Sequence, residues 1–314
     1  MRAAVVVSTY NRAHYLRELI ACLDAQTMSP DEFEVILVDN GSTDETQASR
    51  LTTHRVADNR GPGGGRNVGV AATDAAIIAI TDDDCLPAPQ WLERLVACFD
   101  DPEVVVAQGR VEPDPTARDQ MGPFDHTITV RGATPFFETA NVAYRRGAFD
   151  RSGGFDEHDP LLHPASGRAF GEDAMLGAAV LGDAGAKRAF ADDAVVYHRC
   201  VPRTFGEHLA DIRQLRSFPG LARRSAPLRK FLIGGVFLNS TTVSFDLGVL
   251  GVIVAMLERN PLPMIAVLPW VARRIRSTVW FRGGLRLFVK YAVSDVVTFA
   301  SLVAGSIRYR RLLL

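Results

Sequence analysis

The chain has 314 residues, enough for one large domain or two smaller ones, and 47% of them are hydrophobic, the proportion of a protein with a substantial core. The formal net charge of −1 conceals an asymmetry. Residues 1–200 carry 18 basic and 31 acidic side chains, whereas residues 201–314 carry 17 basic and 5 acidic ones. A basic segment rich in apolar residues points to a membrane surface more than to nucleic acid. We therefore expect no nucleic-acid partner.

The four cysteines show no metal-site or redox spacing, so we expect reduced thiols in a reducing compartment rather than disulfides. Only five apolar residues precede the first polar ones at the N-terminus, too few for a signal peptide. The N-terminal part is therefore expected to be cytoplasmic.

The first two hundred residues alternate strand-like and helix-like patterns. Between residues 119 and 154 the alternation gives way to turns and short strands. This pattern predicts an α/β fold with a doubly wound, mainly parallel sheet covered on both faces. Strands are expected at 3–10, within 33–46, and at 75–80, 104–108 and 192–198, and helices at 12–25, around 91–99 and from near 173.

Polar clusters follow four of the expected strands, at the point where each strand ends. They lie at residues 8–12, 38–44, 81–84 and 197–199. In a parallel α/β sheet, ligands bind beyond the carboxyl ends of the strands. The sequence therefore predicts one site built from these four segments.

Three consecutive aspartates end the apolar run at 75–80. In an extended chain Asp82 and Asp84 point to one side and Asp83 to the other. Two carboxylates on one side suit a hard divalent cation such as Mg²⁺ or Mn²⁺. The alternative is an acidic turn that caps the following helix.

Three other features have both a functional and a structural interpretation. Residues 59–69 contain several glycines and Arg66, which suits a loop approaching a phosphate, or else a flexible surface loop. The segment is neither a dinucleotide fingerprint nor a P-loop. Glu172 and Asp173 stand at a helix start, where acidic residues also act as caps. His198 ends a strand, where a structural role is the alternative.

Taken together and in this order, these stretches resemble the family-2 glycosyltransferases, inverting enzymes of the GT-A fold. The resemblance covers about residues 3–200. The matching stretches are VVVSTYNRAHYLRELIACL, VILVDNGSTDET, NRGPGGGRNVG, ITDDDCLPAPQWLE, ETANVAYRRGAFDRSGGFDE, GEDAMLG and VVYH.

The resemblance implies roles for individual residues. Asp39 meets the nucleotide base, Asp82 and Asp84 form the DxD pair, with Asp84 most directly on the metal, and His198 is a further metal ligand. Asp173 is the catalytic base. The residues expected to bind the donor are Thr9, Asn11, Arg12, Asp39, Arg66, Asp82, Asp83, Asn141, Asp156 and Glu172, of which Asn141 and Asp156 lie where sugar or acceptor is held.

The chemistry agrees with these roles. A divalent metal, Mn²⁺ or Mg²⁺, neutralises the charge that builds on a diphosphate leaving group. The sugar passes through an oxocarbenium-like state, and a carboxylate takes the proton of the acceptor hydroxyl on the opposite face. Single displacement then inverts the anomeric centre. By resemblance the donor is a UDP or TDP sugar rather than a GDP sugar.

We expect a glycosyltransferase domain at 1–225 and a hydrophobic, basic, helical membrane-associated region at 226–314. Residues 231–257 are long enough to span a bilayer. Two clean spans would place many basic residues outside, against the positive-inside rule. We therefore favour association with the cytoplasmic face through a hairpin, re-entrant or in-plane helices. Two transmembrane helices, or a soluble subdomain or oligomer interface, are the alternatives.

This location implies a cell-envelope or lipid-linked glycan acceptor. One alternative is a polyprenyl-phosphate glycosyltransferase that makes a lipid-linked sugar. A second, from another class, is a non-catalytic membrane-bound scaffold that binds nucleotide sugars. A nucleotidyltransferase is disfavoured because no glycine-rich, basic loop follows the first strand.

Overall fold

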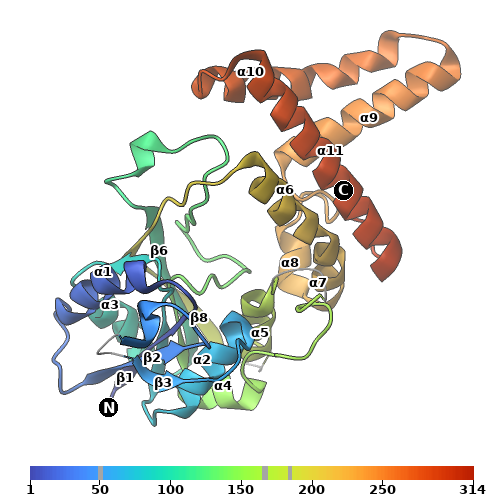
Figure 1. The fold of residues 1–314 in the computed structure, drawn as a ribbon. Coiled ribbons are helices and arrows are strands. Elements are labelled where there is room, and N and C mark those ends of the chain that lie inside the picture. Colours follow the sequence, from blue (N-terminus) through green and yellow to red (C-terminus); the bar gives the residue numbers. More distant parts are fainter. Residues whose placement is uncertain (49–51, 165–168, 183–185) are drawn as a thin grey trace. The chain divides into compact units, whose positions relative to one another are not determined.

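The computed structural model describes residues 1–48, 52–164, 169–182 and 186–314. The chain forms two compact units (Figure 1). The first unit consists of residues 1–121 and 126–201, and the second of residues 122–125 and 202–314.

The first unit is built on a mixed sheet of eight strands in the order β3-β2-β1-β4-β7-β6-β8-β5 (Figure 1). Strands β3, β2, β1 and β4 are parallel, β6 and β8 are parallel, and β7 and β5 run antiparallel to their neighbours. The predicted α/β sheet is thus confirmed. Its strands are β1 (Ala3–Thr9), β2 (Phe33–Asp39), β3 (Thr52–Arg55), β4 (Ile77–Ile80), β5 (Cys85–Pro87), β6 (Val104–Pro113), β7 (Val142–Arg145) and β8 (Lys187–His198).

The strand directions bring the polar strand ends to one edge. Thr9 lies opposite Asp39 in the parallel register of β1 and β2. Because β7 is antiparallel to both β4 and β6, strands β6 and β8 run in the same direction as β4. The carboxyl ends of β1, β2, β4 and β8 therefore share an edge of the sheet.

Both faces of this sheet are covered. Val5 and Val7 of β1 face a core that includes Leu16, Leu19 and Trp91, whereas alternate residues such as Val6 face a second core. Helices α1 (Ala13–Asp24) and α3 (Trp91–Ala97) supply the first core, and α2 (Gly61–Ala71), α4 (Arg146–Ser152) and α5 (Glu172–Val180) supply the second. Burial on both faces explains the continuously apolar strand sequences.

The glycine-rich segment 59–69, which we expected to be a loop, forms most of helix α2. A Cβ atom at Gly65 would lie 2.1 Å from Ser8 Oγ, and one at Gly69 would lie 2.5 Å from Val6 Cγ1. The glycines thus let α2 pack directly on β1. This contact overrides the low intrinsic helix propensity of glycine, which favoured the loop interpretation.

The second unit is helical. Helices α6 and α7 pack against the long helix α11, and Phe124 stacks near Phe205, His208 and Tyr291. These contacts place the division between the units after residue 201, earlier than the boundary at 225 that we expected. The elements are α6 (Phe205–Arg213), η4 (Gln214–Ser217), α7 (Phe218–Arg224), α8 (Ala226–Phe231), α9 (Ser240–Glu258), η5 (Leu262–Val267), α10 (Leu268–Trp280) and α11 (Gly284–Tyr309).

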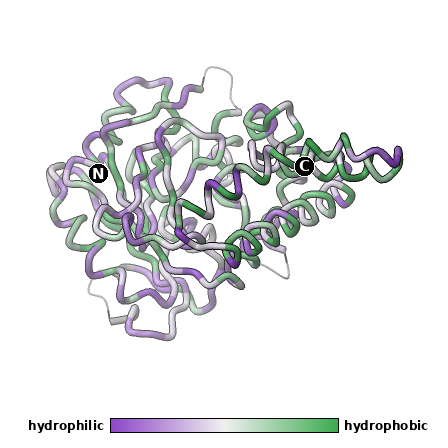
Figure 2. Tube along the Cα trace, turned by 90° about the horizontal axis from the view of Figure 1, so that it is seen from above, coloured by the Kyte–Doolittle hydropathy of each residue, from purple (hydrophilic) through white to green (hydrophobic). Residues whose placement is uncertain are grey.

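Much of this second unit is apolar (Figure 2). Helices α9 and α11 are long and apolar enough to cross a membrane, a weak criterion that core helices of soluble proteins also meet. Only 33% of the apolar window in each is buried. Several large apolar side chains are exposed, among them Leu250, Met256, Leu257 and Leu285. The predicted apolar C-terminal helices are thus present.

Candidate active site

Two arginines donate hydrogen bonds to the three consecutive aspartates. Arg12 Nη1 donates to Asp83 Oδ1 at 2.9 Å and to Asp84 Oδ2 at 2.7 Å. Arg66 Nη2 donates to Asp82 Oδ1 at 2.6 Å. Asp83 and Asp84 lie in a turn after β4, so the extended chain in which Asp82 and Asp84 would point to one side is not formed.

The cluster keeps an excess of negative charge. Asp82, Asp83, Asp84, Glu172 and Asp173 contribute five carboxyl groups, against the two guanidinium groups of the arginines. Burial raises the pKa of Asp83 to about 6, and the charge of Asp84 adds to this rise while Arg12 opposes it. A site with this charge balance attracts a cation.

His198 and Asp84 have the donor set of a divalent metal site. His198 Nδ1 lies 2.8 Å from the carbonyl oxygen of Arg199, and a carbonyl can only accept, so Nδ1 carries the proton. The other ring nitrogen, Nε2, faces Asp84 Oδ1 at 3.5 Å and would be the atom that binds a metal. Two facing lone pairs suit a cation, and imidazole with carboxylate suits Mn²⁺. The residues present therefore fit the metal.

Cys85 lies beside these two groups. The potential ligand atoms of Asp84, Cys85 and His198 all lie within 4.8 Å of one another. Burial raises the pKa of the Cys85 thiol well above its usual range, so the residue stays a thiol. Among the described residues, the group that could hold a metal ion does not include Asp82. The role of Asp82 as a metal ligand stays a prediction.

Asp173 occupies the first turn of α5, which begins at Glu172 directly after the left-handed glycine Gly171 (φ 80°). Burial raises the pKa of Asp173 to about 7, and the adjacent Glu172 contributes to the rise. A carboxyl group with a pKa near neutrality is suited to accept a proton at physiological pH.

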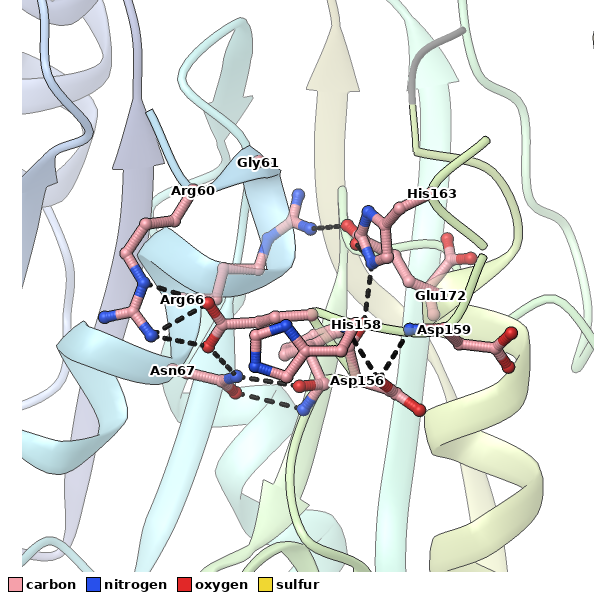
Figure 3. A network of polar contacts seen from close by, with 12 residues as sticks. Arg60, Gly61, Arg66, Asn67, Asp156, His158, Asp159, His163 and Glu172 are labelled. Atoms are coloured by element: carbon pink, nitrogen blue, oxygen red, sulfur yellow. Dashed lines mark hydrogen bonds and ion pairs between the residues drawn. The ribbon is translucent and has the colours of Figure 1, made fainter. Parts of the chain in front are cut away.

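A polar network around α2 includes Glu172, the neighbour of Asp173 in the chain (Figure 3). Arg66 Nη1 donates to Glu172 Oε1 at 3.2 Å while its Nη2 holds Asp82. Its guanidinium carbon also lies 5.5 Å from the centre of the Phe155 ring. Arg66 is thus one buried cation shared by two acidic segments of the site.

The same network fixes the loop before α5. Arg60 makes a bidentate pair with Glu157, and Asn67 Nδ2 donates to Glu157 Oε1 at 3.0 Å and to the Phe155 carbonyl at 2.8 Å (Figure 3). Our sequence analysis missed Arg60, Asn67 and Glu157 as site residues. All three lie in stretches that carry the resemblance, but nothing in the sequence shows that they meet.

The residues expected around the nucleotide lie at the ends of β1 and β2. Thr9 Oγ1 donates to Asp83 Oδ2 at 2.8 Å, and Asn11 has a left-handed backbone (φ 54°) and accepts from the Thr43 amide. Asp39 is fully buried. Its Oδ1 accepts from the Ser42 amide at 2.8 Å, whereas its Oδ2 has no hydrogen bond among the described residues.

Two residues that we expected to bind the donor make hydrogen bonds within the protein. Both amide hydrogens of Asn141 are donated to backbone carbonyls, those of Arg110 and Ala194, and its oxygen accepts from Trp91 Nε1. Asp156 Oδ1 accepts from the amides of His158 and Asp159 and closes a turn. The amide donors of Asn141 are already used inside the protein, and the role of this residue toward the sugar stays a prediction.

The architecture is that of a GT-A-type glycosyltransferase. The mannosyltransferase PcManGT from Pyrobaculum calidifontis, solved with GDP-Man and Mn²⁺, superposes with a TM-score of 0.58 at 20% identity, over 98% of this chain and 87% of that one. Residues 1–349 of S. aureus TarS, solved with UDP, give a TM-score of 0.53 at 18% identity, over 99% and 92%. These likenesses establish the fold.

The model of glycosyl transferase family 2 matches residues 4–155 of the chain. The O-antigen chain rhamnosyltransferase RfbN of Salmonella typhimurium strain LT2 is 30% identical over 63% of this chain and 66% of its own length. Glycosyltransferase AglE of Haloferax volcanii is 32% identical over 35% of this chain and 39% of its own length. The matches thus span less than two thirds of these relatives. The resemblance found in the sequence is confirmed.

Proposed function

We propose that the protein is a metal-dependent, inverting glycosyltransferase that moves a sugar from a nucleoside diphosphate to an acceptor hydroxyl. The observation that carries this proposal is Asp173, a carboxyl group whose pKa is raised to about 7. Its neighbour Glu172 accepts from Arg66, which also donates to Asp82 after β4. A base and an acidic, cation-attracting cluster in one site are what transfer from a nucleotide sugar requires.

Asp84 and His198 would hold the divalent cation, Mn²⁺ or Mg²⁺, and Asp82 is the further ligand expected from the sequence. When bound, the ion supplies positive charge to the diphosphate leaving group. Arg12 and Thr9 donate to Asp83, and Arg66 donates to Asp82. These three residues therefore supply hydrogen-bond donors beside the aspartates that follow β4. The PcManGT structure solved with Mn²⁺ is consistent with a divalent metal in this fold.

Asp173 then acts as the general base. It takes the proton of the acceptor hydroxyl while the hydroxyl oxygen bonds to the anomeric carbon. The bond between that carbon and the diphosphate oxygen breaks on the opposite face, and the electron pair leaves with the diphosphate. One displacement inverts the configuration.

Asp39 favours uracil or thymine as the base of the donor. Oδ1 accepts from the Ser42 amide, and Oδ2 is the carboxylate oxygen that has no hydrogen bond among the described residues. One acceptor matches the single imide N–H of uracil or thymine, whereas guanine presents two N–H groups side by side. Arg55 Nε, 3.6 Å from Asp39 Oδ2, can donate to a neighbouring carbonyl of the pyrimidine. UDP or TDP sugars are therefore the proposed donors.

The acceptor is proposed to be a lipid-linked or cell-envelope glycan at the cytoplasmic face of the membrane. The exposed apolar helices and the basic charge of the second unit support this location. A 28% identical relative, over half of this chain, is a glucosyl-dolichyl phosphate glucuronosyltransferase of Haloferax volcanii. That name describes transfer to a lipid-linked sugar. The apolar helices would also suit the second candidate, a polyprenyl-phosphate glycosyltransferase.

The test is thermal unfolding of the purified full chain with UDP, TDP, GDP or CMP, each with and without Mn²⁺. A ligand at a hundred times its dissociation constant adds about 2.7 kcal/mol to the free energy of unfolding. We expect UDP or TDP to stabilise the protein only with Mn²⁺, and Asp84→Ala to abolish the shift. The control, Asp74→Ala, removes an exposed carboxylate before β4 and should keep it.

No shift with any nucleotide in the folded wild-type protein would contradict the proposal. A shift without turnover on any acceptor would favour the non-catalytic scaffold. An equal or larger shift with GDP would contradict the role given to Asp39.

A further inference from the structure

The second unit contains an apolar groove with one cation at its side. Helix α9 forms one wall, and η5 and α10 form the other. The groove has a volume of about 370 Å³, which lies within the range of small-molecule sites. Its lining residues are Ile233, Ser240, Val243, Ser244, Leu247, Ala266, Pro269 and Arg273.

The groove is a built feature, because η5 is fitted against small residues of α9. A Cβ atom at Gly251 would lie 2.4 Å from the Pro263 carbonyl oxygen and 2.9 Å from Ala266 Cβ. At Gly248 it would lie 3.4 Å from Val267 Cα. The two glycines of α9 therefore set how closely the second wall approaches the first.

The groove continues onto apolar surface. Leu247 lines it and is 46% exposed, and Ile233, at its other side, is 47% exposed. Leu250 and Leu268 extend the apolar surface nearby on α9 and α10, and both are more than half exposed. An occupant that comes from a hydrocarbon phase would enter such a groove without crossing a polar barrier.

The charge at the groove selects an anion. Arg273 is exposed and has no acidic partner among the described residues, whereas its neighbour Arg274 is held by Asp295. Residues 201–314 carry 17 basic and only 5 acidic side chains. The complement of an apolar groove with a single unpaired guanidinium is an amphiphile with a negative head and a hydrocarbon tail.

We propose that this groove binds a prenyl phosphate, with the isoprenoid chain along Val243, Leu247 and Pro269 and the phosphate on Arg273. The inference rests on the proposed function only for the choice of a prenyl chain, the carrier expected of a lipid-linked acceptor. It assigns a second binding site, apart from the acidic site on the sheet.

The experiment uses the full chain in detergent and farnesyl phosphate as the probe, with binding followed by native mass spectrometry. We expect Arg273→Glu to weaken farnesyl phosphate at least tenfold and Arg276→Glu to leave it within twofold. Arg276 is exposed on the same helix, but it does not line the groove. Both changes alter the net charge equally.

A second pair of variants tests the tail. Leu247→Trp should block the groove, whereas Leu257→Trp adds the same bulk to an exposed position of α9 outside it. Equal effects within either pair would overturn the proposal, as would competition by inorganic phosphate at the concentration of the probe. Preference for lysophosphatidic acid over farnesyl phosphate would overturn the choice of a prenyl chain. The nucleotide-dependent thermal shift is measured separately, so this proposal can fail while the proposed function stands.

Discussion

At Asp173, burial and a neighbouring carboxylate both raise the pKa. Removal from water disfavours the charged form, and the charge of Glu172 disfavours it further, so the pKa rises to about 7. Burial also raises the pKa of Glu172, and the charge of Arg66, which pairs with this residue, opposes that rise. Neighbouring carboxyl groups of one site thus have different protonation behaviour, which is the basis for different roles.

The pH profile of sugar transfer tests this assignment. The base must be deprotonated, so kcat/KM should fall as pH drops through about 7. Asp173→Asn should lower kcat by roughly 10²- to 10⁴-fold, the usual contribution of general-base catalysis. A profile that is flat between pH 5 and 8 in the wild-type enzyme would contradict the assignment.

A stability measurement provides the control. The pKa of Asp173 is raised in the folded protein above its ordinary value of 3.8, so the folded state binds more protons between about pH 4 and 7. This residue therefore makes the free energy of unfolding fall as pH rises through that interval. Asp173→Asn should reduce that fall, as followed by urea denaturation.

The sequence predicted which strand ends carry the site but not how its charges pair. Thr9, Asp39, Asp84 and His198 could be placed together because parallel strands end at one edge. Their partners come from far along the chain. Arg12 meets Asp83 across 71 positions and Arg66 meets Glu172 across 106, separations over which no local pattern carries information.

At the scale of elements, helix α2 shows how close packing can override local preference. Its glycines lower helix propensity, yet they permit contact with β1 that no larger residue allows. Helix propensity alone predicts a loop for this segment. The helix forms because the glycines pack against Ser8 and Val6, which lie in strand β1, far from α2 in the sequence. The helix in turn positions Arg66.

Alanine substitutions test this packing. Gly65→Ala and Gly69→Ala place a Cβ atom against Ser8 Oγ and Val6 Cγ1, so each should lower the free energy of unfolding by about 1–3 kcal/mol. The control is Gly147→Ala in α4, where the nearest atom is the flexible Arg151 guanidinium, 3.4 Å away. That change should be neutral or slightly stabilising. Similar losses in all three variants, measured by chemical denaturation, would contradict the packing argument.

At the scale of the whole chain, the division into an acidic first part and a basic, apolar second part is already visible in the composition. The position of the boundary was not predictable to within a few residues, because α6 and α7 have ordinary sequences and join α11 through tertiary contacts. Hydropathy likewise gives the length of α9 and α11 but not their orientation in a membrane.

Accessibility of the turn after α9 tests the expected topology. Arg259 is exposed at the end of this helix, and the positive-inside rule favours the cytoplasmic side for it. In a background with Cys22, Cys98 and Cys200 changed to serine, Arg259→Cys should react with an impermeant maleimide only from the cytoplasmic side. Arg310→Cys, after α11, is the matched probe. Labelling of Arg259→Cys only from the opposite side would establish a spanning α9 and overturn the in-plane arrangement.

The shared guanidinium of Arg66 has a consequence for any mutational survey of this enzyme. Removing Asp82 or Glu172 changes the position and charge environment of the same cation, so each single substitution also disturbs the other carboxylate. Effects on activity will then not be additive, and a double-mutant cycle between Asp82 and Glu172 should show an interaction energy of about 0.5–3 kcal/mol although the two side chains are joined only through an arginine. The effect of each single substitution would therefore include the disturbance of Arg66, and this contribution would be attributed to both residues.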